Sequence, residues 1–113
     1  MKFGLSLKTI TAIQAVFAKY PQVSQVLLYG SRAKGNYRNG SDIDLTLLGS
    51  KLTLNDTLYP IMDDIDDLDL PYSFDLSLFK QLDDVDFLDH IKRIGVVFYQ
   101  KANSEELNNF CAG

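Results

Sequence analysis

The sequence predicts one small α/β or α+β domain in which a β-sheet carries helices on at least one face. Three observations support this fold class. The 113 residues are enough for a single hydrophobic core. Apolar residues recur with the helical period in some segments and with the two-residue period of strands in others. These segments follow one another as helix, strand, strand, helix, strand, helix and strand, with no repeat, linker or domain boundary, so residues 1–113 form one domain.

The first half of the chain predicts one helix and two strands. Ser6 is a suitable N-cap for a helix over residues 7–20, which Pro21 ends. Residues 23–29 (VSQVLLY) form the apolar run expected of a buried strand. After a polar segment rich in glycine and asparagine, residues 43–48 (IDLTLL) predict a second strand.

The second half predicts two helices and two further strands. Apolar residues step by three and four over residues 54–68, as expected of a helix that ends before a proline. Residues 72–79 alternate with period two, so Asp75 should point away from its two apolar neighbours. A last amphipathic helix over 82–94 leads to a short strand at 96–100.

Composition narrows the class of protein. With 46% hydrophobic and 23% charged residues, and no apolar run long enough to span a bilayer, the chain has the composition of a soluble globular protein without a membrane partner. The N-terminus lacks the features of a secretory signal. Cys111 is the single cysteine, so no internal disulfide can form. We therefore expect a cytoplasmic location.

The net charge of −4 is unevenly distributed. Residues 1–51 carry seven basic and two acidic residues, whereas residues 52–113 carry four basic and thirteen acidic residues. An acidic protein of this size is poorly suited to bind long nucleic acid, because that affinity depends on many cationic phosphate contacts. A small anionic ligand at one basic spot remains compatible with the sequence.

Two carboxylates stand one residue apart at the second strand. Asp42 and Asp44 should project from the same face, because strand side chains alternate. Like charges held side by side are unfavourable unless a cation lies between them. Hard divalent cations such as Mg²⁺ use one or two carboxylates together with substrate phosphates. The pair therefore indicates a metal bridge, although two solvated aspartates on a strand surface are the simpler interpretation of this pattern alone.

Two further features favour the metal interpretation. Gly30 and Ser31 end the preceding strand and are followed by Arg32, so backbone N–H groups and the serine hydroxyl could approach a phosphate. Asp75 offers a third carboxylate from another strand. A phosphate loop with three carboxylates is a site for a nucleoside triphosphate.

These residues carry a resemblance to a known family. The stretch GSRAKGNYRNGSDIDL, residues 30–45, places ten residues between Gly30-Ser31 and Asp42, and a later FDL contains Asp75. This pattern resembles the signature of the DNA polymerase β-like nucleotidyltransferases. It is most similar to their minimal nucleotidyltransferase branch, whose members pair as antitoxins with HEPN-domain toxins.

The resemblance implies a small mixed sheet with helices packed on it, the polymerase β palm-like fold, and catalysis with two Mg²⁺ ions. It implies that Asp42, Asp44 and Asp75 ligate the metals and are the catalytic residues. Four residues would serve the nucleotide: Gly30 and Ser31 would hold the phosphates of ATP, Ser41 would support the loop, and Arg32 would pair with phosphate charge. Lys34 is a less certain phosphate contact, because the branch more often has arginine there.

The resemblance also implies a reaction and a partner. The chain would transfer AMP from ATP to a hydroxyl, expected to be a tyrosine of a HEPN toxin, and so act as its antitoxin. Two alternatives stay open: a non-catalytic nucleotide-binding antitoxin that blocks its partner sterically, and an aminoglycoside-type transferase acting on a small molecule. The base preference of the nucleotide is not predicted.

Other polar groups have simpler interpretations. The run DDIDDLD, residues 63–69, lacks the spacing of a calcium-binding EF-hand and is expected on the solvated side of the second helix. A role for this run as an acidic patch that faces a partner is the alternative. His90, the single histidine, has no second ligand at metal-binding spacing and is expected to be structural.

Overall fold

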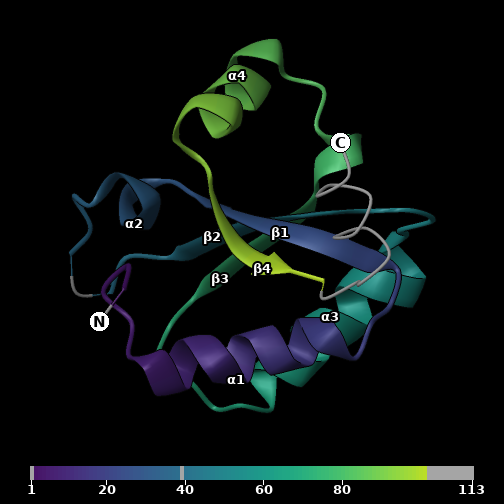
Figure 1. The fold of residues 1–113 in the computed structure, drawn as a ribbon, viewed down its shortest axis with the longest axis horizontal. Helices are drawn as coiled ribbons and strands as arrows, with labels where there is room; N and C mark the ends of the chain where they lie inside the picture. The colour runs from purple at the N-terminus through teal and green to yellow at the C-terminus, as the bar shows by residue number, and fades with distance from the viewer. Residues whose placement is uncertain (1, 39, 102–113) are drawn as a thin grey trace, which may run out of the picture.

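The computed structural model describes residues 2–38 and 40–101. Its helices and strands follow the predicted order, and three short elements are added to them: α2, a π-helical turn and a 3₁₀ turn. In chain order the elements are α1 (Leu7–Ala18), β1 (Val23–Tyr29), α2 (Ser31–Lys34), β2 (Ile43–Gly49), the π-helical turn (Leu54–Leu58), α3 (Tyr59–Asp66), β3 (Phe74–Leu78), the 3₁₀ turn (Phe79–Gln81), α4 (Val85–Ile94) and β4 (Val96–Gln100). The strands form one sheet in the order β3-β2-β1-β4 (Figure 1).

The sheet is mixed, as expected. The central strand β1 pairs antiparallel with both β2 and β4, whereas β2 pairs parallel with β3. The parallel register places Ile43 opposite Phe74 and Asp44 opposite Asp75. The predicted fold class is therefore confirmed, and the structure adds the strand order and the register.

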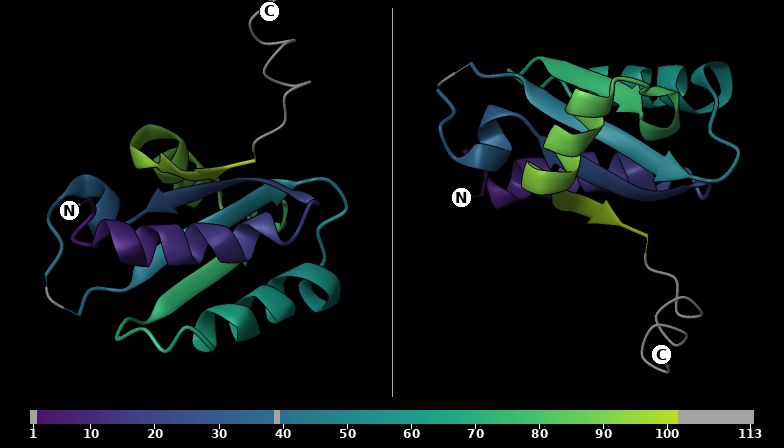
Figure 2. Two further views of the ribbon diagram at one scale, coloured as in Figure 1. Left: turned by 60° about the horizontal axis from the view of Figure 1, so that its bottom comes forward. Right: turned by 90° about the horizontal axis from the view of Figure 1, so that it is seen from above.

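Two helices cover one face of the sheet. Figure 2 shows α1 and α3 on the same side, with α4 on the other. The residues that face α1 and α3 form the hydrophobic core, and alternate residues of the strands contribute to it. Fully buried core side chains are Ile13 and Phe17 of α1, Val26 and Leu28 of β1, Ile43, Leu45 and Leu47 of β2, and Ile61 of α3.

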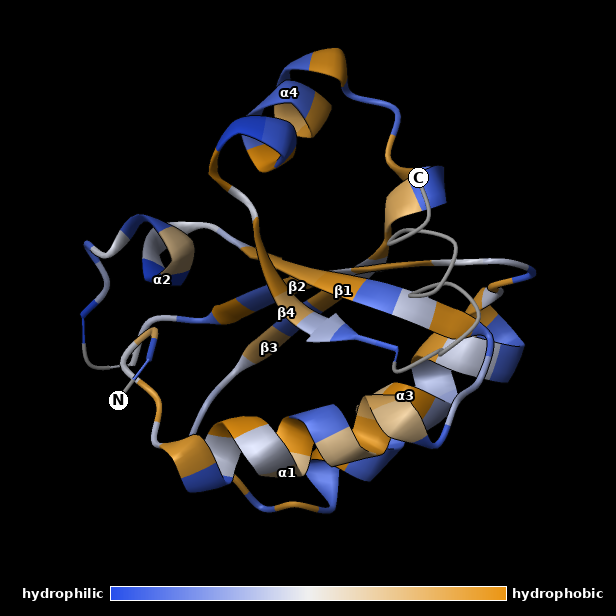
Figure 3. Cartoon of the chain, in the orientation of Figure 1, coloured by the Kyte–Doolittle hydropathy of each residue, from blue (hydrophilic) through white to orange (hydrophobic). Residues whose placement is uncertain are grey.

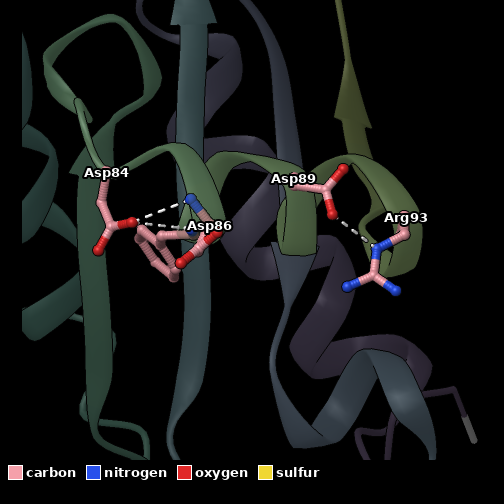
Figure 4. Close-up of polar contacts among 5 residues, drawn as sticks. Asp84, Asp86, Asp89 and Arg93 are labelled. Carbon is pink, nitrogen blue, oxygen red and sulfur yellow. Dashed lines mark hydrogen bonds and ion pairs between the residues drawn. The ribbon is translucent and has the colours of Figure 1, made fainter.

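Local signals in the sequence set the helix ends. The side chain of Ser6 accepts a hydrogen bond from the Thr9 backbone N–H at 3.1 Å, which confirms it as the N-cap of α1. At the start of α4, the Asp84 carboxylate accepts hydrogen bonds from the backbone N–H groups of Asp86 and Phe87, at 3.0 and 3.3 Å (Figure 4). One turn further on, Asp89 and Arg93 form an ion pair of 3.0 Å on the solvent side. Hydrophobic and hydrophilic residues alternate around α4 (Figure 3).

Three details differ from the sequence-based prediction. The loop after β1 contains the short helix α2, which no periodicity could reveal in four residues. The helix predicted over 54–68 begins with a π-helical turn and is α-helical only over α3. The helix predicted from residue 82 starts at Val85, after its cap. Cys111 and the tail from residue 102 lie outside the described residues. No described helix has the length and apolar character needed to cross a membrane.

Candidate active site

Two of the three predicted carboxylates, Asp44 and Asp75, are paired on neighbouring strands, and Asp42 lies two residues before Asp44. Asp44 of β2 is the register partner of Asp75 on β3 and of Tyr29 on β1, so the three side chains lie on one face. Asp42 directly precedes β2 instead of lying on it. This face is the one opposite α1 and α3, because the neighbouring residues Ile43 and Leu45 are fully buried in the core.

The carboxylates differ in environment. Asp44 is half-buried, whereas Asp42 and Asp75 are exposed. Burial raises the pKa of Asp44 above its ordinary value, and the negative charges of Asp75 and Asp42 raise it further. The positive charge of Arg32 acts in the opposite direction. Ionising Asp44 therefore costs more free energy in the folded protein than in water, and added positive charge would lower that cost.

The same carboxylates provide the donor type that a hard cation needs. All three are oxygen donors, as Mg²⁺ prefers. Within residues 2–38 and 40–101, however, no three acidic, histidine or cysteine side chains converge closely enough to form a coordination sphere as they stand. Asp42 and Asp75 are exposed, so their side chains have room to adopt other rotamers.

Gly30 connects β1 to α2 in a conformation that requires glycine. Its φ of 79° and ψ of −158° lie in a region that L-residues with side chains essentially do not occupy. A methyl group at this position would also overlap the carboxylate of Asp44. The backbone of the turn and the Asp44 carboxylate are therefore in close contact, as a phosphate loop next to a metal site would require.

Arg32 is turned into the protein instead of toward solvent. Its side chain is 3% exposed. Nε and Nη2 donate to the carbonyl oxygen of Ser41 at 3.1 and 2.9 Å, and Nη1 donates to the carbonyl oxygen of Phe3 at 2.8 Å. The guanidinium also stacks on the rings of Tyr37 and Tyr72, with its carbon 5.4 and 5.2 Å from the ring centroids. Three of its donors therefore hold the backbone around the site, which differs from the phosphate contact expected from the sequence.

Three other predicted site residues lie in the loop and the short helix between β1 and β2. Ser41 closes the loop, because its hydroxyl accepts a bond from the Arg38 backbone N–H at 2.8 Å and its own N–H donates to the Arg38 carbonyl at 3.0 Å. Ser31 begins α2 and is half-buried. Lys34 ends α2 and is exposed.

One residue of the site was not assigned a role from the sequence. Tyr29 ends the strand that the sequence predicts to be buried, and it is 5% exposed, but it lies on the carboxylate face, where its ring meets Phe87 of α4 edge-on at 5.4 Å. Burial and the nearby Asp75 raise the pKa of Tyr29 to about 12, so the phenol stays protonated. The two-residue alternation within β1 could have found this residue, because Val26 and Leu28 face the core and Tyr29 therefore faces the other side. His90 is half-buried on α4, consistent with the structural role expected for it.

The mixed sheet with the glycine turn and the carboxylates at one end is the nucleotidyltransferase fold. A family profile described as polymerase beta, nucleotidyltransferase matches residues 11–104. The chain therefore belongs to the polymerase beta nucleotidyltransferase family. No curated protein sequence matches it.

Solved structures share this fold at low sequence identity. One is a toxin–antitoxin crystallised with AMP-PNP, with a TM-score of 0.63 and 19% identity over 91% of this chain and 80% of that chain. Another is the toxin–antitoxin MntA-HepT, with a TM-score of 0.61 and 16% identity over 90% and 79% of the two chains. A candidate nucleotidyltransferase from Sulfolobus solfataricus has a TM-score of 0.53 and 23% identity over 83% and 79%.

Proposed function

We propose that this protein transfers AMP from ATP to a tyrosine hydroxyl of a partner HEPN toxin and thereby acts as its antitoxin in the cytoplasm. The register of β2 and β3 carries the proposal, because it sets Asp44 beside Asp75 at the glycine turn of β1. Family membership supports the reaction class. The AMP-PNP and toxin–antitoxin structures that share the fold support the nucleotide and the type of partner.

Asp42, Asp44 and Asp75 would hold two Mg²⁺ ions. The raised pKa of Asp44 supports this assignment, because an added cation would relieve the repulsion that its neighbours cause. Bound there, Mg²⁺ would neutralise phosphate charge and lower the pKa of the attacking hydroxyl. The exposed positions of Asp42 and Asp75 leave room for ligand exchange.

Other residues of the chain would bind the phosphates and support the loop. Gly30 and Ser31 would bind the β- and γ-phosphates through backbone N–H groups and the hydroxyl, and Ser41 would keep the loop closed behind them. The acceptor oxygen would form a bond to the α-phosphorus while the bond to the bridging oxygen of the pyrophosphate breaks. The proton of the hydroxyl would pass to a carboxylate of the site, and pyrophosphate would leave.

Arg32 would take part as a positioning residue. Its bonds to the carbonyl groups of Phe3 and Ser41 tie the N-terminal segment to the loop that ends at Asp42. A lysine could keep the charge but not the planar fork of donors. Phosphate contacts would then come from the exposed Lys34 and the turn at Gly30.

The test is to incubate the protein with ATP, Mg²⁺ and the purified product of the adjacent gene, which the proposal expects to be the toxin. We expect the mass of the toxin to rise by one or more AMP units on a peptide that contains tyrosine, and its toxicity to fall. A toxin that is neutralised without any mass change would instead support steric inhibition by a non-catalytic antitoxin. Adenylylation of an aminoglycoside, with the toxin unmodified, would support the small-molecule transferase.

A further inference from the structure

The outer strand β3 has one edge without a partner strand among residues 2–38 and 40–101. In this described part of the chain, β3 is last in the strand order and pairs only with β2. The Ile43 backbone N–H donates to the Ser73 carbonyl at 2.9 Å, so in this parallel pair the backbone polar groups of Asp75 and Ser77 also face β2. Those of Phe74, Leu76 and Leu78 face outward. An edge of this kind is a template for one more strand.

A groove runs along this edge, with α3 as its other wall. It encloses about 520 Å³. Its apolar lining comes from both walls, with Met62 and Ile65 on the helix side and Phe74 and Leu76 on the strand side. Met62 is 42% exposed and therefore offers apolar surface at the helix wall of the groove. A strand beside a helix, with an apolar floor between them, is the geometry that binds extended peptides by β-addition.

The rim of the groove has one sign of charge. Asp63, Asp66 and Asp69 line it, and its lining includes no lysine or arginine. Aspartates there would complement lysine or arginine side chains of an extended segment and disfavour acidic ones. The occupant that fits is therefore a basic segment that can form a strand.

We propose that such a segment of the partner protein adds to β3 in this groove and carries the acceptor hydroxyl. This inference rests on the function proposed above. Side chains of an added strand alternate between two faces. Those next to Phe74 and Leu76 would enter the groove, whereas those between them would lie on the face of Asp75. Directly opposed residues of neighbouring strands have Cβ atoms about 4.5–5.5 Å apart, so a tyrosine on that face would stand beside Asp75.

A synthetic peptide tests the docking step without ATP. Its groove-side positions alternate valine and lysine, and its other positions are threonine around one central tyrosine. In NMR titrations we expect it to shift the amide signals of Phe74, Leu76 and Leu78, whose N–H groups face outward. N-methylation of the peptide residues whose N–H groups face β3 should abolish binding, because it removes the hydrogen bonds between the strands. N-methylation of the residues whose N–H groups face away from β3 should preserve binding. Equal binding by both methylated peptides, shifts elsewhere, or no binding at millimolar concentration would overturn the proposal.

Charge variants give a second readout with a matched control. Asp66→Asn with Asp69→Asn removes two charges from the rim, and asparagine tolerates the positive φ of 55° at residue 69. We expect affinity for the peptide to fall roughly tenfold. Asp83→Asn with Asp86→Asn removes two exposed charges near α4 and should change the affinity by less than about twofold. Equal effects of the two double variants would contradict a specific groove.

The outcomes separate docking from chemistry. If the toxin is adenylylated equally well by Asp66→Asn/Asp69→Asn and by the unchanged protein, the docking inference fails while the proposed function stands. If the peptide binds the β3 edge as expected but no acceptor ever gains AMP, the proposed function fails and the groove is a docking site for inhibition alone.

Discussion

The two faces of the sheet are made by the same strands but meet different requirements. On the face covered by α1 and α3, the residues of β1 and β2 are aliphatic and fully buried. On the opposite face, alternate positions of the same strands carry Tyr29, Asp44 and Thr46, joined by Asp75 and Ser77 of β3. The aliphatic residues stabilise the fold by forming the core. The residues of the opposite face can carry charge, because they do not have to form that core. The comparison predicts that substitutions on the two faces have separable effects.

The largest effect is expected from Asp42→Asn combined with Asp44→Asn. Transfer of AMP should fall by about 1,000-fold or more, because the metal-binding charges are lost. Folding should survive, since the change keeps the shape of both side chains and removes repulsion. Mass spectrometry of the acceptor and circular dichroism of the variant measure the two effects. Full activity in the double variant would refute the assignment of this face.

Adjacent leucines of β1 test the other side of the comparison. Leu28 is fully buried in the core, so Leu28→Ala should lower the free energy of unfolding by about 2–5 kcal/mol. Leu27 points to the opposite face and is only partly buried, so Leu27→Ala should cost less than half as much. Urea denaturation of both variants gives the ratio. Similar losses would mean that the carboxylate face is also core.

Gly30→Ala should weaken ATP binding on the order of tenfold or more, because the backbone conformation and the contact with Asp44 both exclude a Cβ atom. Calorimetry with ATP and Mg²⁺ measures the loss. Gly35→Ala is the control for left-handed backbone strain, because its φ is 89° but no atom lies within 4 Å of the added carbon. If both variants bind ATP with the same affinity, ATP binding does not depend on the contact between the turn and Asp44.

Arg32→Lys distinguishes the buried arginine from a phosphate ligand. Loss of the bonds to Ser41 and Phe3 should reduce stability by about 1–3 kcal/mol and also weaken ATP binding through the loosened loop. Lys34→Gln, at an exposed position nearby, should leave stability nearly unchanged. An Arg32→Lys variant of full stability that loses only ATP affinity would restore the interpretation of Arg32 as a phosphate contact.

The smallest effect concerns pH. The pKa of Asp44 is higher in the folded than in the unfolded chain, so ionising it destabilises the fold. This cost is absent below the unfolded pKa of about 4, grows as pH rises toward the folded pKa, and is complete above it. Asp44→Asn should therefore raise Tm at pH 7 and have no effect on it at pH 3. An equal rise at both pH values would show that ionisation is not the cause.

Sequence alone determined the features that depend on local periodicity. The alternation within IDLTLL and FDLSL separates Asp44 and Asp75 from their apolar neighbours. The helical spacing in α1, together with the cap at Ser6, fixed that helix and its buried face. Glycine at residue 30 marked the turn that ends β1. These patterns repeat over two to four residues, so they are visible in any window of the chain.

Only the tertiary structure decided which of these elements became neighbours. The parallel pairing of β2 with β3 brought Asp75 to Asp44 from a position 31 residues further along the chain. Arg32 turned inward because the carbonyl groups of Phe3 and Ser41 lie within its reach after folding. Among the described residues, the edge of β3 has no partner strand because the strand order ends there. Each outcome depends on contacts between residues distant in sequence, and the packing that selects among such contacts leaves no local periodic signal.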